Sequence, residues 1–215
     1  MSLVYDFLEL VSISSSIMPL FLFFLIRNTK GVQNNLFLLI LCLFTLEFVV
    51  EFACLILSRN GIYTNPIIHI YSILYILLIF NIYRKLIESD TIIKIALVSV
   101  LIFLPISVIE FVKNLYLPNT ISYTFLSLLT IFLSTAFFSQ MLNDRSIKSF
   151  MKYSLFWINS GFLLFFGTTV CLSLFEYYIN FENPDLVYYL WPVQLISNIV
   201  FYILIAKGIW LMKRI

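Results

Sequence analysis

Hydrophobic residues dominate this chain in long runs, and only short polar segments separate one run from the next. Seven of the runs are long enough to cross the roughly 30 Å apolar core of a bilayer as helices. They extend over about 4–26, 36–58, 67–87, 92–112, 121–142, 152–178 and 186–211. Glycine, proline, asparagine and charged residues fill the connections, which are too short to fold as separate domains. The pattern predicts an all-α polytopic membrane protein in which residues 1–215 form a single domain, a seven-helix transmembrane bundle.

The composition of the chain agrees with this interpretation. Of the 215 residues, 62% are hydrophobic and only 11% are charged, and the mean hydropathy is +1.03. A soluble domain carries about 25% charged residues, so the composition indicates a protein that is embedded in the lipid bilayer. The first run lacks the basic start and the small-residue cleavage site of a secretory signal, and we expect it to remain as the first helix.

The basic residues lie almost entirely on one side of the predicted bundle. Eleven of the thirteen lie near the connections after the first, third and fifth runs or near the C-terminus: Arg27, Lys30, Arg84, Lys85, Lys94, Arg145, Lys148, Lys152, Lys207, Lys213 and Arg214. Only Arg59 and Lys113 fall on the opposite side. Because basic residues are enriched in cytoplasmic loops, we predict a multi-pass protein of the cell (inner) membrane. Its N-terminus lies outside and its C-terminus in the cytoplasm.

Two glutamates, Glu47 and Glu51, interrupt the second apolar run near its middle. A carboxylate at the centre of a membrane helix costs at least about 2.5 kcal/mol, so we expect the pair to face protein, water or a ligand rather than lipid. Residues four apart lie on one helix face, and the predicted orientation puts Glu51 about 6 Å nearer the outer surface. The pair would share a proton or hold a cation between its carboxyl groups. The alternative is a purely structural, hydrogen-bonded role.

Other acidic, aromatic and polar residues gather toward the predicted outer end of the bundle. Those we expect near a ligand or a proton are Glu9, His69, Tyr71, Tyr75, Glu110, Trp191 and Gln194. Together with the glutamate pair they predict an outward-facing pocket that binds a small cation, an amine or a proton, with aromatic faces adding cation–π contacts. The alternative for Asp6, Glu110, Glu176 and Glu182 is that these acids only face water at helix ends. His69 has a similar alternative as an interfacial residue.

A second polar layer lies deeper, toward the predicted cytoplasmic side. Asn159 and Ser160 occupy the sixth run, and Ser197 and Asn198 occupy the seventh. Asparagine and serine at such positions form hydrogen bonds between membrane helices. We therefore predict that this layer holds helices together, with Asn81, Ser134 and Thr135 of other runs as further members.

The motifs of common enzyme and cofactor sites are missing from the sequence. It contains no Gly-rich phosphate loop, HExxH, CxxC or GxSxG motif. Cys42, Cys54 and Cys171 all fall within apolar runs and are interpreted as small hydrophobic residues, and Lys207 lies too near the cytoplasmic edge to hold retinal. We predict no enzymatic activity, no cofactor, no metal and no nucleic-acid partner.

One resemblance rests on two features of the chain. They are the predicted seven-span layout and the stretch Phe156-Trp157-Ile158-Asn159-Ser160-Gly161, which continues to Gly167. The chain resembles the seven-helix membrane sensor regions at the N-terminus of bacterial histidine kinases and the small free-standing proteins associated with such kinases. The 215 residues contain no kinase domain. The resemblance therefore implies signal reception with output through a separate partner.

The leading hypothesis is a receptor-like protein in which a small ligand, ion or lipid biases the bundle between two arrangements. A cytoplasmic signalling partner would read the change at the basic loops, although anionic lipid headgroups are also attracted to such a face. One alternative is an ion- or proton-coupled transporter that uses Glu47 and Glu51. Another is a non-catalytic accessory subunit of a larger membrane complex.

Overall fold

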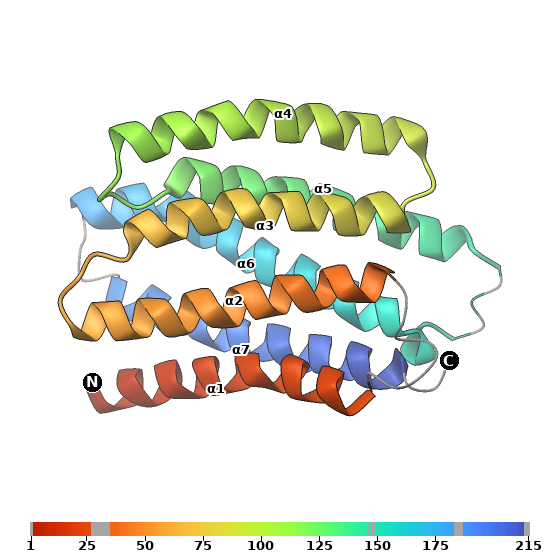
Figure 1. The fold of residues 1–215 in the computed structure, drawn as a ribbon, viewed down its shortest axis with the longest axis horizontal. Coiled ribbons are helices and arrows are strands. Elements are labelled where there is room, and N and C mark those ends of the chain that lie inside the picture. The colour runs from red at the N-terminus through yellow and green to blue at the C-terminus, as the bar shows by residue number, and fades with distance from the viewer. Residues whose placement is uncertain (1, 27–34, 146, 148, 183–186, 213–215) are drawn as a thin grey trace.

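Seven long α-helices and one short 3-10 helix, with no strand, make up the part of the chain that the computed structural model describes (Figure 1). This part comprises the backbone of residues 2–26, 35–145, 147, 149–182 and 187–212; side chains are described for 7–26, 35–145, 147, 149–174 and 190–212. The helices are α1 (Ser2–Ile26), α2 (Asn35–Arg59), α3 (Asn65–Leu86), α4 (Asp90–Lys113), α5 (Thr120–Asn143), η2 (Phe150–Lys152), α6 (Ser154–Glu182) and α7 (Val187–Met212).

The prediction of seven apolar membrane-length helices is confirmed over the described residues, where each of α1 to α7 contains a stretch long and apolar enough to cross a membrane. The predicted runs coincide with the helices to within a few residues. At 152 the prediction runs past a break, because η2 and Tyr153 precede the start of α6 at Ser154. The orientation of the bundle in the membrane stays a prediction.

Six of the helices form a ring, and α4 lies outside it (Figure 1). Around the ring, α1 contacts α2, α2 contacts α3, α3 contacts α5, α5 contacts α6, α6 contacts α7, and α7 returns to α1. α4 packs on α3 and α5. The chain begins at one end of the bundle, with the α2–α3 and α4–α5 connections, and finishes at the other end, with the α3–α4 connection. We call these the N-terminal and C-terminal ends.

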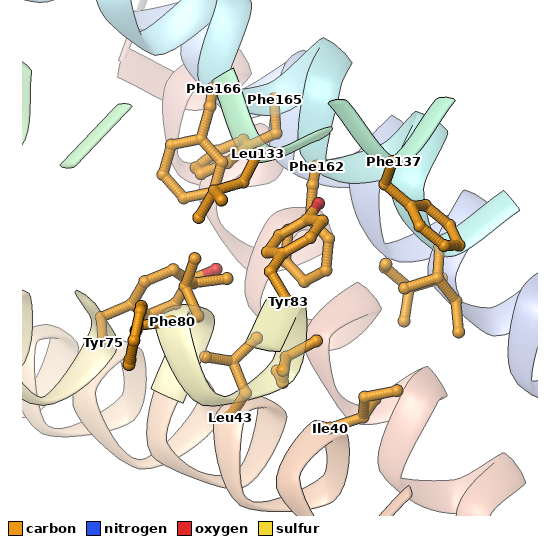
Figure 2. Close-up of a cluster of buried hydrophobic side chains, with 14 of the residues drawn as sticks. Ile40, Leu43, Tyr75, Phe80, Tyr83, Leu133, Phe137, Phe162, Phe165 and Phe166 are labelled. Atoms are coloured by element: carbon orange, nitrogen blue, oxygen red, sulfur yellow. The ribbon is translucent and has the colours of Figure 1, made fainter. Parts of the chain in front are cut away.

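Large aromatic and branched side chains fill the interior of the ring from the level of Tyr75 toward the C-terminal end (Figure 2). The Tyr83 and Phe162 rings lie 6.3 Å apart between α3 and α6, and Phe162 also contacts Phe201 of α7 at 5.6 Å. Lipid tails are as apolar as these side chains, so van der Waals packing rather than hydrophobic burial stabilises the contacts between membrane helices. The dense packing closes the C-terminal half of the bundle.

A polar triad lies within this packed half and joins three helices. The Tyr83 hydroxyl of α3 donates to Asn159 Oδ1 of α6 at 2.6 Å and shares a second hydrogen bond of 2.6 Å with Ser134 Oγ of α5. Asn159 Nδ2 donates to the Ser134 carbonyl oxygen at 3.0 Å. Each partner in these bonds is buried, so the three helices are tied at one level.

Ser160, Ser197 and Asn198 of the predicted polar layer take no part in this triad. Ser160 bonds to the Phe156 carbonyl of its own helix, and Asn198 Nδ2 reaches Ser12 Oγ of α1 at 3.4 Å. Ser197 Oγ is buried and forms no hydrogen bond with any residue that the structure describes. Among Asn159, Ser160, Ser197 and Asn198, therefore, the side chains of Asn159 and Asn198 join different helices within the described part of the chain.

A glycine brings α6 and α7 together near the C-terminal end. A Cβ atom added at Gly208 would lie 2.5 Å from Ile158 Cγ1 and 2.9 Å from the Ser154 carbonyl oxygen. These distances are well below van der Waals contact, so the two backbones approach closely only because residue 208 has no side chain. The close approach adds to the sealing of this half.

Candidate functional site

A cavity of about 540 Å³ occupies the N-terminal half of the bundle. Its described wall comes from α2, α3, α5, α6 and α7, together with Thr64 and Pro118 of the connections at the N-terminal end. The cavity reaches inward to Glu47, which is the central residue of the 25-residue helix α2. Its size is typical of sites for small organic molecules.

Glu47 lies at the deep end of the cavity and is only 4% exposed. Its Oε1 atom accepts a hydrogen bond of 2.7 Å from the Tyr75 hydroxyl of α3. Its Oε2 atom is buried and has no hydrogen-bond partner among the described residues. The carboxyl group is thus held through one oxygen and left unsatisfied at the other, which is costly for a buried polar group.

Glu51 repeats this arrangement one helical turn nearer the N-terminal end. Its Oε1 atom accepts a hydrogen bond of 2.8 Å from the Tyr202 hydroxyl of α7, and its Oε2 atom is buried and has no hydrogen-bond partner in the described part of the chain. The side chain is half-buried and lines the cavity. The two tyrosines therefore connect α2 to α3 on one side and to α7 on the other.

Helical periodicity places these groups on facing surfaces. Glu47 and Glu51 are four residues apart and so share one face of α2. On α7, the cavity-lining residues follow the three- and four-residue spacing of one helix face: Leu190, Trp191, Gln194, Leu195, Asn198 and Tyr202. The stretch from Leu190 to Tyr202 rises about 18 Å along the helix, so the cavity is elongated.

Aromatic rings and amide groups form much of the remaining wall. Tyr71, Tyr123 and Phe165 line it from α3, α5 and α6, and the Tyr71 ring lies 5.2 Å from that of Tyr75. Asn119 Nδ2 donates to the Ile68 carbonyl and to Ser72 Oγ. Such aromatic faces attract cations.

The cavity has an acidic character. Glu47 and Glu51 line it, whereas no Lys, Arg or His side chain does so among the described residues. The amide nitrogens of Gln194 and Asn198 each donate to a protein hydroxyl, at 3.4 Å in both cases. The wall therefore offers two carboxyl groups and no basic side chain among the described residues, and a cation with N–H or O–H donors would complement the carboxyl oxygens.

The predicted site residues separate into two groups. Of the residues expected near a ligand, Glu47, Glu51, Tyr71, Trp191 and Gln194 line the cavity. Tyr75 stands behind the lining, as the donor to Glu47. The described wall does not include Glu9, His69 or Glu110. Glu9 is half-buried on α1, and the side chains of Asp6, Glu176 and Glu182 lie outside the described residues.

Glu110 has a structural position at the end of α4. Its carboxylate accepts hydrogen bonds from the backbone N–H groups of Ile121 at 3.1 Å and Ser122 at 2.9 Å, and from the Ser122 hydroxyl. The first N–H groups of a helix have no partner within that helix, and a negative charge there also interacts favourably with the helix dipole. Glu110 is buried and caps α5, so the water-facing alternative does not describe it.

His69 lies beside the α4–α5 connection rather than in the cavity wall. The ring is buried, its Nε2 atom is 3.3 Å from the Leu117 carbonyl oxygen, and its edge contacts the Phe111 ring. Its Nδ1 atom is buried, and no described residue forms a hydrogen bond with it. The histidine thus contacts the α4–α5 connection and the end of α4.

The sequence prediction did not include Tyr202, Tyr123 or Cys54, all of which line the cavity. The spacing held a usable signal for two of them. Tyr202 follows Asn198 by four residues, and Cys54 follows Glu51 by three, so each shares a helix face with a polar residue. Tyr123 carries no such signal, because its place depends on how α5 packs against α3.

No group of three or more His, Cys, Asp or Glu residues that could hold a metal occurs in the described part of the chain. Comparisons with protein-family models, with curated proteins and with solved structures find no match to this chain. The resemblance to histidine-kinase sensor regions therefore stays a prediction, and the functional argument depends on the geometry of the cavity.

Proposed function

We propose that this protein is a receptor-like membrane protein whose cavity binds a small organic cation that enters from the N-terminal end. The observation that carries the proposal is the pair of carboxyl groups, each with one unpartnered oxygen, on side chains that line a cavity of about 540 Å³. Burial of an unpartnered carboxyl is unfavourable, and a cationic ligand with hydrogen-bond donors would relieve that cost.

The same contacts suggest how binding alters the bundle. Glu47 bonds to Tyr75 of α3 and Glu51 bonds to Tyr202 of α7. A ligand that draws on both carboxyl groups changes the links between α2 and two neighbouring helices, and so binds one arrangement of the helices better than another.

The output would lie at the C-terminal end, which we assign to the cytoplasm. Six exposed basic residues occur at this end among those described: Arg84, Lys85, Lys94, Arg145, Lys152 and Lys207. A separate signalling partner with an acidic surface would recognise this face, and anionic lipid headgroups would be attracted to it as well.

Ligand-dependent stabilisation tests this function. Phenethylamine is the probe, added to the purified protein in lipid nanodiscs while thermal unfolding is followed. We expect it to raise the unfolding temperature of the wild-type protein and of Glu88→Gln, a control at an exposed acid of the α3–α4 connection, because a ligand that binds the folded state stabilises it. The stabilisation should disappear in Glu47→Gln. Equal stabilisation of Glu47→Gln and wild type would refute the proposal.

A second candidate is an ion- or proton-coupled transporter. The position of Glu47 at the centre of α2 favours it, since transporters bind their substrates near the midplane of the membrane. Proteoliposomes separate the two functions: a transporter moves phenethylamine or protons across the bilayer and loses the flux in Glu47→Gln, whereas the receptor binds the amine without flux.

A further inference from the structure

We infer that the cavity selects amines whose ammonium group carries at least two N–H donors, with one such group donating hydrogen bonds to both Glu47 and Glu51. This inference rests on the proposed function, which requires only that a cation binds. It goes further by specifying the chemistry of the charged group and the shape of the molecule attached to it.

The number of available acceptors determines the charged group. The Oε2 atoms of Glu47 and Glu51 are both buried and unpartnered, and the two residues lie one turn apart on α2, with about 5–6 Å between their Cβ atoms. A primary ammonium group has three N–H donors and can reach two carboxylate oxygens at about 2.8 Å each. A quaternary ammonium has no N–H donor and would leave both oxygens unpartnered.

The tyrosine hydroxyls hold one oxygen of each carboxyl group before the ligand arrives. Tyr75 donates to Glu47 Oε1 at 2.7 Å, and Tyr202 donates to Glu51 Oε1 at 2.8 Å. Each donor restrains the rotation of its carboxyl group and occupies one oxygen. Both Oε2 atoms are buried, so each carboxyl group must turn about its tyrosine-bound Oε1 atom for the ammonium group to reach Oε2.

The shape of the cavity specifies the rest of the molecule. The space extends beyond the carboxyl groups toward the N-terminal end, along about 18 Å of α7, and the rings of Tyr71, Tyr123 and Trp191 line it. A bare ion would leave most of the roughly 540 Å³ unfilled. An apolar or aromatic body attached to the ammonium group contacts these rings and fills the cavity.

Three matched probes test the inference by isothermal titration of the wild-type protein in nanodiscs: phenethylamine, its N-trimethyl derivative and phenylethanol. We expect phenethylamine to bind at least about tenfold more tightly than the trimethyl derivative, because the trimethyl derivative cannot donate hydrogen bonds to the carboxyl groups. Phenylethanol, which has no charge, should bind more weakly still. Glu47→Gln and Glu51→Gln should each weaken phenethylamine binding by about tenfold, and Glu88→Gln should leave it unchanged.

The outcomes separate this inference from the function on which it rests. Equal affinity for phenethylamine and its trimethyl derivative, with weaker binding of phenylethanol, overturns the selectivity for N–H donors but supports a cation site. Equal affinity for all three probes, or binding of none, overturns both. The probe series uses the wild-type protein, so a folding defect in Glu47→Gln does not affect its outcome, and the half-buried Glu51 provides a second, milder variant.

Discussion

At the scale of single residues, the donors around a buried carboxyl group distinguish a structural acid from a binding acid. Glu110 accepts bonds from two backbone N–H groups and a hydroxyl, and its position at the start of α5 explains all three. Glu47 and Glu51 each accept a hydrogen bond from a tyrosine hydroxyl at one oxygen, and each retains an unpartnered oxygen. Residues of the same type thus have different surroundings within one bundle, and the proposed function assigns ligand binding only to Glu47 and Glu51.

The cap predicts that Glu110→Ala lowers the unfolding free energy by about 1–2 kcal/mol, the usual cost of losing a helix cap. Glu110→Gln should cost less, because the amide oxygen still accepts one of the backbone N–H bonds. Thermal unfolding in nanodiscs measures both effects. Phenethylamine affinity should not change in either variant, and a tenfold loss of affinity would place Glu110 in the binding site instead of at the cap.

The tyrosine donors give a second residue-scale prediction. Tyr75→Phe removes the hydroxyl that donates to the buried Glu47 carboxyl, so the unfolding free energy should fall by about 1–3 kcal/mol. Tyr202→Phe should cost less, since Glu51 is only half-buried. Tyr116→Phe, at an exposed tyrosine of the α4–α5 connection, is the matched control, and an equal loss in all three variants would contradict the assigned roles.

The sequence could identify the glutamate pair because depth in an apolar run is a one-dimensional property, and the cost of a charge at that depth needs no knowledge of the neighbours. It could not assign Glu110 or His69, since their roles depend on which helix lies beside them. Tyr75 was predicted near a ligand from its level in the membrane, whereas its bond to Glu47 depends on the rotation of α3 about its axis. The depth of each residue in the membrane could be predicted from the sequence, whereas its contact partners on neighbouring helices could not.

At the scale of helices, the pair α6 and α7 contributes both to the packed half of the bundle and to the wall of the cavity. α6 and α7 meet at Gly208, where an added Cβ atom would lie 2.9 Å from the Ser154 carbonyl oxygen. Toward the N-terminal end the same two helices line the cavity through Thr169 and Gln194. The apolar runs predicted both helices, but not this contact, because glycine spacing alone does not say which helix approaches.

The close contact predicts a difference between two glycines of this helix pair. Gly208→Ala should lower the unfolding free energy by about 1–3 kcal/mol, because the added methyl group collides with backbone atoms of α6. Gly167→Ala should be neutral or stabilising, since a Cβ atom added there would meet nothing within 4 Å and alanine favours helix over glycine. Thermal unfolding of the two variants measures the difference, and equal effects would contradict the close approach.

At the scale of the whole molecule, the bundle combines an acidic cavity in one half with a packed core in the other. Glu47 marks the deep end of the cavity, and the Tyr83–Ser134–Asn159 triad lies within the packed half. The exposed basic residues described at the C-terminal end add a charge asymmetry along the bundle axis. If the orientation that the basic residues predict is correct, the proposed ligand would enter the cavity from outside the cell.

A native cysteine permits a direct test of this arrangement. Cys54 lines the cavity, whereas Cys42 and Cys171 are exposed on the outer surface of the bundle. In a Cys42→Ala, Cys171→Ala background, membrane-impermeant methanethiosulfonates that carry a trimethylammonium or a sulfonate group can react only with Cys54. Each rate is measured from either side of oriented vesicles and divided by the rate with a free thiol in solution.

We expect Cys54 to react from the side of the N-terminal end. Its reaction with the cationic reagent should be at least about tenfold faster than with the sulfonate, because an acidic cavity concentrates cations. Glu47→Gln with Glu51→Gln should remove the preference, and phenethylamine should slow the reaction. Equal rates with the two reagents, a faster rate with the sulfonate, or reaction only from the side of the C-terminal end would contradict an acidic cavity that admits cations from outside.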